Sequence, residues 1–246
     1  MFVKPQWPAS AKIKAVSTTR IGGVSTGIYG ALNLGAHVGD DDAAVEHNRS
    51  LLTQALSLPA APNWLNQVHG AEIVDAAIID ASTAPGVVPD ADGCYSHQEN
   101  AVCVVMTADC LPLLLSNIDG SEIAAVHVGW RGMAAGIIER AVAKFNCAPS
   151  EILAWAGPSI GPRKFEIGLD VRHQLGGSDD AFQTAANGKV FANLYQLAGE
   201  RLSALKVTEY SYADTCTYSD SERFFSYRRD GQCGRMASLI WLEPGR

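Results

Sequence analysis

Three residues carry side chains that can bind a metal or act as nucleophiles, and each stands beside an expected chain turn: His69, Cys110 and His127. Two imidazoles and a thiolate suit zinc, which would keep a fourth position for water. The three are far apart in sequence, and no HxxxH or CxxC pattern joins them. Two other interpretations therefore stay open: an ordinary buried histidine, and a Cys110–His127 pair in which the imidazole activates the thiol.

A β-hairpin would bring Cys110 and His127 together. Apolar runs lie on both sides of a turn sequence at residues 117–120. If Ser116 pairs with Ser121, Cys110 falls directly opposite His127, and the two Cβ atoms lie roughly 5 Å apart on one face. A loop that closes one residue differently would separate them. The hairpin register is therefore a testable part of the hypothesis.

The elements that must position these residues can be read from the apolar pattern. Strands are predicted at residues 13–17, 72–79, 102–106, 111–115, 123–128, 152–156, 206–212 and 236–242, and helices at 133–145 and 194–205. No repeat and no clean linker interrupts the chain. This pattern predicts one domain over residues 1–246, of the α/β class, with a mixed and largely antiparallel sheet.

A further helix is predicted from the carboxylates at 40–42, which suit a helix N-terminus, and it ends before Pro59. Its buried stripe is expected at Val45, Leu51, Leu52 and Leu56. Asn48 and Arg49 are then expected on its other faces.

Composition limits the partners and the compartment. The net charge of −7 argues against nucleic acid as the main partner. Six cysteines without a CxxC pattern are typical of reduced thiols in a cytosol. No apolar run approaches membrane-spanning length, and the N-terminus has no signal core. The sequence thus predicts a cytoplasmic protein without a membrane partner.

The segments around the three residues are specific. They read Asn66-Gln67-Val68-His69-Gly70, Thr107-Ala108-Asp109-Cys110-Leu111-Pro112 and His127-Val128-Gly129-Trp130-Arg131-Gly132. These segments resemble the signatures of the YfiH-type family, whose members are described as laccase-domain polyphenol oxidases, purine nucleoside phosphorylases or peptidoglycan editing factors. The likeness spans nearly the whole chain. It implies a four-layer α-β-β-α sandwich and a zinc ion held by His69, Cys110 and His127.

The resemblance also implies an activity: phosphorolysis of adenosine, inosine, guanosine and methylthioadenosine, and hydrolytic deamination of adenosine. A zinc ion with three protein ligands lowers the pKa of its bound water to about 7, which would supply a hydroxide for attack on the purine C6 atom. A carboxylate would have to carry the proton, and the candidates are Asp92, Asp109 and Glu166. Phosphate needs a cationic pocket, for which the candidates are Arg20, Arg49, Arg131 and Arg228. Arg228 or a neighbour is expected to line the metal pocket, although each arginine could equally form a structural salt bridge.

Four alternatives remain at this point. A single copper ion could replace zinc, because copper binds such ligands more tightly. A multicopper laccase cluster is a different case, because it needs many more histidines than the six of this chain. Cys110 and His127 could form a metal-free cysteine hydrolase. The family's cell-wall role, removal of L-serine from a muropeptide precursor, is a different substrate class. A non-catalytic zinc protein would need a fourth ligand, for which His37 is the candidate.

Overall fold

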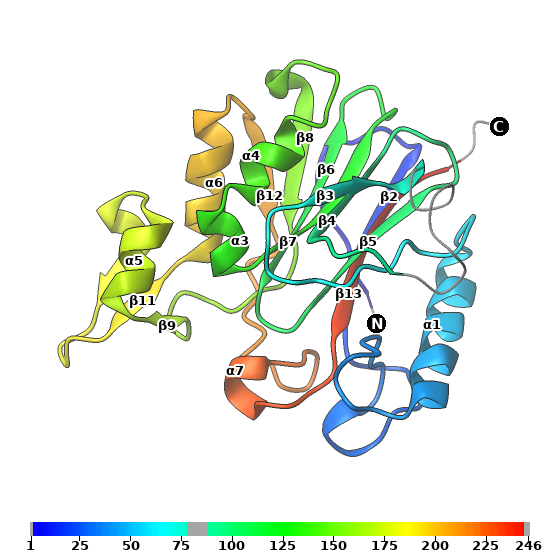
Figure 1. Cartoon of the computed structure of the whole chain (residues 1–246), viewed down its shortest axis with the longest axis horizontal. Helices are drawn as coiled ribbons and strands as arrows, with labels where there is room; N and C mark the ends of the chain where they lie inside the picture. The colour runs from blue at the N-terminus through cyan, green and yellow to red at the C-terminus, as the bar shows by residue number, and fades with distance from the viewer. Residues whose placement is uncertain (1, 78–87, 244–246) are drawn as a thin grey trace.

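Two β-sheets form the centre of the computed structural model, which describes residues 2–77 and 88–243 (Figure 1). The larger sheet has six strands in the order β12 (Glu209–Tyr212), β8 (Ile152–Ala156), β6 (Leu111–Asn117), β7 (Ile123–Val128), β4 (Gly93–Ser96) and β3 (Ile73–Asp75). The second sheet has the order β1 (Phe2–Val3), β2 (Ile13–Thr18), β13 (Met236–Leu242) and β5 (Val102–Thr107). A small third sheet holds β10 (Phe182–Thr184), β11 (Val190–Ala192) and β9 (Glu166–Ile167).

The strand pairs are mostly antiparallel, as predicted. The parallel exceptions among the described strands are β3 with β4 and β12 with β8. Apolar side chains from both large sheets meet between them, among them Cys94, Val105, Leu114 and Trp155. The two sheets therefore stack face to face around one buried layer.

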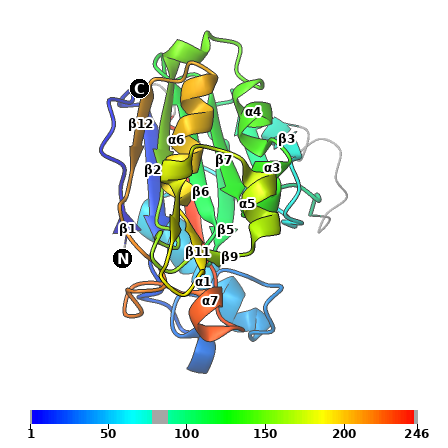
Figure 2. The same cartoon turned by 90° about the vertical axis from the view of Figure 1, so that its left-hand side faces the viewer.

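Helices cover the two outer faces. The six-stranded sheet is covered by α3 (Trp130–Ala134), α4 (Ile137–Val142) and α6 (Leu194–Ala204), which stand in front of its strands in Figure 2. On the other side, α1 (Asp42–Leu56) packs its Leu52 against the four-stranded sheet. Two short helices, α5 (Leu169–Leu175) and α7 (Tyr227–Asp230), lie outside these layers. The four-layer α-β-β-α architecture is thus confirmed, and no helix in residues 2–77 or 88–243 has the length and apolar character to cross a bilayer.

The β6–β7 hairpin forms, but its register differs by two residues from the predicted one. Ser116 pairs with Ile123 rather than with Ser121, and His127 stands opposite Pro112 rather than Cys110. Strand side chains alternate between faces, so an even shift keeps each residue on its face. Cys110 and His127 therefore remain diagonal neighbours on the same side.

Four local predictions were wrong, in whole or in part. The single helix expected at residues 133–145 is two short helices, because Gly136 adopts a φ of +84° between them. Asn48 faces the interior rather than solvent, where its amide donates to the Asn33 carbonyl at 2.9 Å. The strand predicted at residues 206–212 is β12, which begins only at Glu209. Of the strand predicted at 72–79, β3 covers Ile73–Asp75, and positions 78–79 lie outside the described residues.

Candidate metal centre

His69, Cys110 and His127 lie together: one ligand atom from each falls within 4.8 Å of the others. His69 is in the turn that precedes β3, Cys110 lies directly before β6, and His127 is in β7. The two imidazole rings meet edge to face, with centroids 4.8 Å apart. A tetrahedral ion bonded to each ligand at roughly 2.0–2.3 Å holds its ligand atoms roughly 3.3–3.8 Å apart, so a small inward shift of these side chains would complete the coordination. The hairpin and the turn before β3 thus bring the three predicted ligands together.

Glycine at position 129 leaves room for this group. A Cβ atom there would lie 3.1 Å from Cδ2 of His69 and 3.3 Å from Sγ of Cys110. Both distances are shorter than an ordinary van der Waals contact. A side chain at Gly129 would therefore push the ligands away from one another.

Asp92 connects the two histidines. Its carboxylate is fully buried and accepts a hydrogen bond from Nδ1 of His127 at 2.7 Å. It also accepts from the backbone N–H groups of Val68, His69 and Gly70, at 3.2, 3.0 and 2.6 Å. Burial alone would raise the pKa of Asp92, but the His127 contacts and the N–H groups hold it below its usual value. An ionised Asp92 only accepts, so Nδ1 carries the hydrogen and Nε2 of His127 is left to bind a metal.

The same contacts favour a thiolate at Cys110. Burial by itself raises the pKa of this thiol, but the charge of His127 and hydrogen bonds from His127 and His69 lower it to about 6. Burial also opposes protonation of His127, yet the Cys110 charge and the Asp92 hydrogen bond raise its pKa to about 9. A metal needs the deprotonated sulfur, so the surroundings already stabilise the form of Cys110 that binds one.

The donor set fits a zinc ion with an open position. Among the residues that the structure describes, the group contains three potential ligands. His37 lines the adjoining cavity without joining the group. Three protein ligands of this kind are typical of catalytic zinc, whereas structural zinc usually has four. Imidazole and thiolate also bind copper, so the donor set does not by itself choose between the two metals.

The ligands open into a cavity of about 390 Å³ that contains two cationic side chains, Arg131 and Arg235. The guanidinium of Arg131 stacks over Trp130 at 4.6 Å, and it forms no hydrogen bond or ion pair within residues 2–77 and 88–243. Arg235 donates to the backbone carbonyl of Cys233 at 2.8 Å. The described lining contains no carboxylate. The cavity is therefore suited to an anionic group next to the metal ligands.

The structure gives the other three predicted arginines different surroundings. Arg20 donates to the Gly30 carbonyl at 2.7 Å, and Arg49 donates to the Leu34 carbonyl at 2.9 Å. Arg228 is exposed and donates to a backbone carbonyl in β9. None of them belongs to the described lining of the metal cavity. These contacts give the three arginines structural roles through backbone carbonyls, rather than through the salt bridges that the sequence left open.

The remaining predicted carboxylates are also engaged elsewhere. Asp109 is buried and accepts from the hydroxyls of Thr217 and Ser226, at 2.6 and 3.0 Å. Its φ of +99° places it in a left-handed turn directly before Cys110. Glu166 forms an exposed ion pair with Lys189 at 2.7 Å. Neither acid, nor Asp92, is among the described lining residues of the cavity.

Sequence reasoning missed three residues of the lining: His37 as a reactive group, Tyr227 and Arg235. Burial, followed by the charge of Arg235, lowers the pKa of His37, so its imidazole is neutral at neutral pH. Tyr227 is the neighbour of Arg228 and lies in the pocket in its place, without supplying charge. Arg235 directly precedes β13, and this position at a strand end was the signal that could have identified it.

Known proteins are similar to this chain in sequence and in fold. A family model described as "Multi-copper polyphenol oxidoreductase laccase" matches residues 14–243. The chain is 48% identical to a Shigella flexneri protein named purine nucleoside phosphorylase YfiH, over 98% of both chains. It is 44% identical to a purine nucleoside phosphorylase of Haemophilus influenzae, over 98% of this chain and 99% of the relative. The crystal structure of Neisseria meningitidis protein NMB0706 superposes with a TM-score of 0.91 at 42% identity, over 99% of both chains.

Proposed function

The chain belongs to the laccase-domain family described as multi-copper polyphenol oxidoreductases, and from that premise we propose that it is a metal-dependent enzyme of purine nucleosides. One observation carries the proposal: the His69, Cys110 and His127 group opens into a cavity with two arginines and no described carboxylate. The proposed reactions are phosphorolysis of adenosine, inosine, guanosine and methylthioadenosine, and hydrolytic deamination of adenosine. They would take place in the cytoplasm, where the cysteines remain reduced.

Zinc is the proposed ion, held by His69, Cys110 and His127, with Cu²⁺ as the alternative. When bound, the ion supplies Lewis acidity to an oxygen placed next to it. A multinuclear copper cluster is not supported, because residues 2–77 and 88–243 contain no second group of three potential ligands. Copper-dependent polyphenol oxidation would therefore have to run at one mononuclear site.

The chain's own side chains would do the remaining work. In phosphorolysis a phosphate oxygen bonds to C1′ while the C1′–N9 bond breaks, and the purine leaves with the electron pair and takes a proton. Arg131 and Arg235 line the cavity, and they would hold the phosphate through charge-assisted hydrogen bonds. In deamination water replaces the amino group at C6, and ammonia leaves.

Proton transfer needs a titratable group within reach of the substrate. Asp92, Asp109 and Glu166 were the predicted carriers, but each is held by other partners. We assign Asp92 and Asp109 a positioning role and give the proton-transfer role to His37, which lines the cavity as a neutral imidazole.

Two alternatives retain specific support. The first is a cysteine hydrolase, in which an acid orients a base and the base activates a nucleophile. Asp92, His127 and Cys110 could fill these three roles, and the pKa of the Cys110 thiol is lowered. That mechanism leaves His69 without a role. A peptidoglycan-precursor editing hydrolase would use the same two arginines for a carboxylate or phosphate of its substrate. The substrate class thus needs a direct assay.

The decisive assay combines metal analysis with a nucleoside panel. We expect about one zinc ion per chain. Inosine, guanosine and methylthioadenosine should release free base only when phosphate is present, whereas adenosine should also yield inosine and ammonia without phosphate. Metal-loaded protein that turns over none of the four nucleosides would contradict the proposal. If the copper-loaded protein oxidises polyphenols with oxygen and the zinc-loaded protein does not, the result would instead support the oxidase alternative.

Arg131→Gln is expected to raise the phosphate KM by roughly tenfold or more, because a charge-assisted hydrogen bond contributes about 1.5–3 kcal/mol. Adenosine deamination, which uses no phosphate, should change much less. Arg228→Gln is the matched control: it removes the same charge from an exposed residue outside the described cavity lining. Steady-state kinetics at varied phosphate concentration give the phosphate KM of both variants. Equal effects of the two substitutions would show that Arg131 does not hold phosphate.

A further inference from the structure

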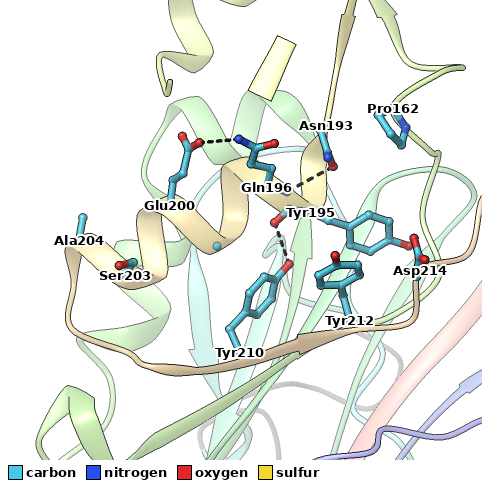
Figure 3. Close-up of a pocket in the computed structure, with 11 residues that line it drawn as sticks. Pro162, Asn193, Tyr195, Gln196, Glu200, Ser203, Ala204, Tyr210, Tyr212 and Asp214 are labelled. Atoms are coloured by element: carbon cyan, nitrogen blue, oxygen red, sulfur yellow. Dashed lines mark hydrogen bonds between the residues drawn. The ribbon is translucent and has the colours of Figure 1, made fainter. Parts of the chain in front are cut away.

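A second and larger cavity, of about 780 Å³, lies between α6 and β12 at the edge of the six-stranded sheet (Figure 3). It shares no lining residue with the metal cavity. Its volume is within the roughly 300–1,000 Å³ that small-molecule sites usually have. Nothing in the proposed reactions uses it, so its chemistry can be considered separately.

Three tyrosines form its wall. Tyr210 and Tyr212 are two positions apart on β12 and therefore rise on the same side, toward α6 (Figure 3). Tyr212 stacks on Tyr195 with ring centroids 5.0 Å apart and an interplanar angle of 26°. The Tyr210 hydroxyl donates to the backbone carbonyl of Tyr195 at 2.9 Å. A Cβ atom at Gly199 would lie 3.0 Å from the Tyr210 ring, so this glycine lets the ring approach the helix.

The wall is rigid on one side and open on the other. The buried Tyr195 hydroxyl accepts from the Ser159 N–H and donates to the Thr215 carbonyl, both at 2.9 Å. Tyr212, stacked on it, is 51% exposed, and its hydroxyl forms no hydrogen bond within the part of the chain that the structure describes. The Tyr212 ring is therefore held by the Tyr195 ring and still has exposed aromatic surface that a ligand could contact.

The charged groups of this cavity are all acidic. Asp214 and Glu200 belong to the lining, and the described lining includes no lysine, arginine or histidine. Asp214 follows Tyr212 by two positions and lines the same cavity as Tyr195 and Tyr212 (Figure 3). Asp214 forms no ion pair or side-chain hydrogen bond with residues 2–77 or 88–243. Glu200 accepts hydrogen bonds from Ser178 and Gln196, yet no cation neutralises it in the described structure.

We propose that this cavity binds a small organic cation, an alkylammonium or guanidinium ion, over the face of Tyr212 and against the carboxylate of Asp214. A cation within about 6 Å of a tyrosine ring is attracted by the negative face of the ring. The Asp214 carboxylate would add an ion pair, and Asn193 and Gln196 contribute neutral polar groups to the lining. Phosphate and other anions are disfavoured here by Asp214 and Glu200, which separates this site from the arginine-lined metal cavity.

Choline and its neutral carbon isostere, 3,3-dimethyl-1-butanol, provide the direct test, with agmatine as the guanidinium probe and inorganic phosphate as the anion control. Titration calorimetry and chemical-shift mapping on the full-length protein would measure binding. We expect choline or agmatine to bind saturably, with the isostere at least fivefold weaker, as loss of about 1 kcal/mol of cation–π attraction implies. Phosphate should not shift the Tyr212 signals. Added salt should weaken cation binding, because Asp214 contributes charge.

Asp214→Asn is the sharpest variant. Asp214 has a φ of +45°, a conformation that asparagine also tolerates, so the substitution removes the charge and leaves the backbone favourable. It should weaken cation binding at least fivefold, and Tyr212→Leu should do the same, whereas Tyr212→Phe keeps a ring and should retain most of the binding. Asp119→Asn, in the exposed β6–β7 turn, is the charge-matched control. Nucleoside turnover and metal content should be unchanged in every variant.

Three outcomes would overturn the proposal. The first is binding of the neutral isostere as tightly as choline. The second is cation binding that Asp214→Asn and Tyr212→Leu leave intact. The third is the absence of saturable binding by either cation up to roughly 10 mM, which corresponds to less than about 3 kcal/mol of binding free energy. Because these readouts do not use turnover, they stand whether or not the nucleoside activity is found.

Discussion

Removal of the metal is expected to abolish nucleoside turnover and to turn Cys110 into the fastest-reacting thiol of the protein. In the metal-loaded protein the sulfur would be a ligand and therefore shielded from alkylation. Once free, it has a pKa of about 6 and is mostly thiolate at neutral pH. The pKa values of Cys103, Cys147 and Cys233 are raised by burial, so these thiols react more slowly. Chelation should thus change activity and alkylation together.

The experiment compares metal-loaded, chelated and zinc-restored protein. Iodoacetamide labelling followed by mass spectrometry locates the modified thiol, and turnover of adenosine and inosine is measured on the same samples. Cys110→Ser should lose metal and activity together, since a neutral hydroxyl replaces thiolate poorly. Cys216→Ser is the matched control, because Cys216 is half-buried and outside the described lining of the metal cavity. Full activity of metal-free protein, lost on alkylation of Cys110, would instead establish the cysteine hydrolase.

Substitution of Asp92 is expected to have the largest effect of any change outside the ligands. Its carboxylate holds Nδ1 of His127 and three backbone N–H groups of the turn that carries His69. Asp92→Asn keeps one acceptor oxygen but turns an amide donor toward groups that themselves donate. Loss of such a partner typically lowers metal affinity by about 10–100-fold. Asp92→Ala leaves all four donors unpaired, and we expect it to lower the free energy of unfolding by about 3–5 kcal/mol.

Metal affinity measured by competition with a chelator separates positioning from folding. Asp92→Asn should weaken zinc binding more than it lowers the thermal midpoint, whereas a purely structural carboxylate would lower only the midpoint. The neighbouring Asp90→Asn is the control: Asp90 is exposed, accepts a hydrogen bond from the Asn66 amide, and belongs neither to the candidate ligand group nor to the described lining of the metal cavity. Unchanged zinc affinity in Asp92→Asn would refute the positioning role.

The elements that a local pattern defines could be predicted from sequence. Residues 152–156 and 236–242 form strands with the predicted bounds, and the β6–β7 hairpin forms around its turn. Residues 152–156 and 236–242 are buried on both faces, and a short continuous apolar run of this kind predicts a buried strand without knowledge of its partners. A two-residue slip keeps the faces, so pattern alone could not exclude it. The side chain of Asn117 accepts from the N–H groups of Ser121 and Glu122, and this contact accompanies the observed register.

The types of the three candidate ligands were determined by the sequence itself, because thiol and imidazole chemistry belongs to the residue. The roles of the charged residues were decided only by tertiary structure. A carboxylate or guanidinium acts through whatever it meets, and those partners are distant in the chain: Asp109 meets Thr217 and Ser226, which are 108 and 117 positions away. Arg131 and Arg228 are equivalent as sequence signals, yet folding places only Arg131 in the described lining of the metal cavity.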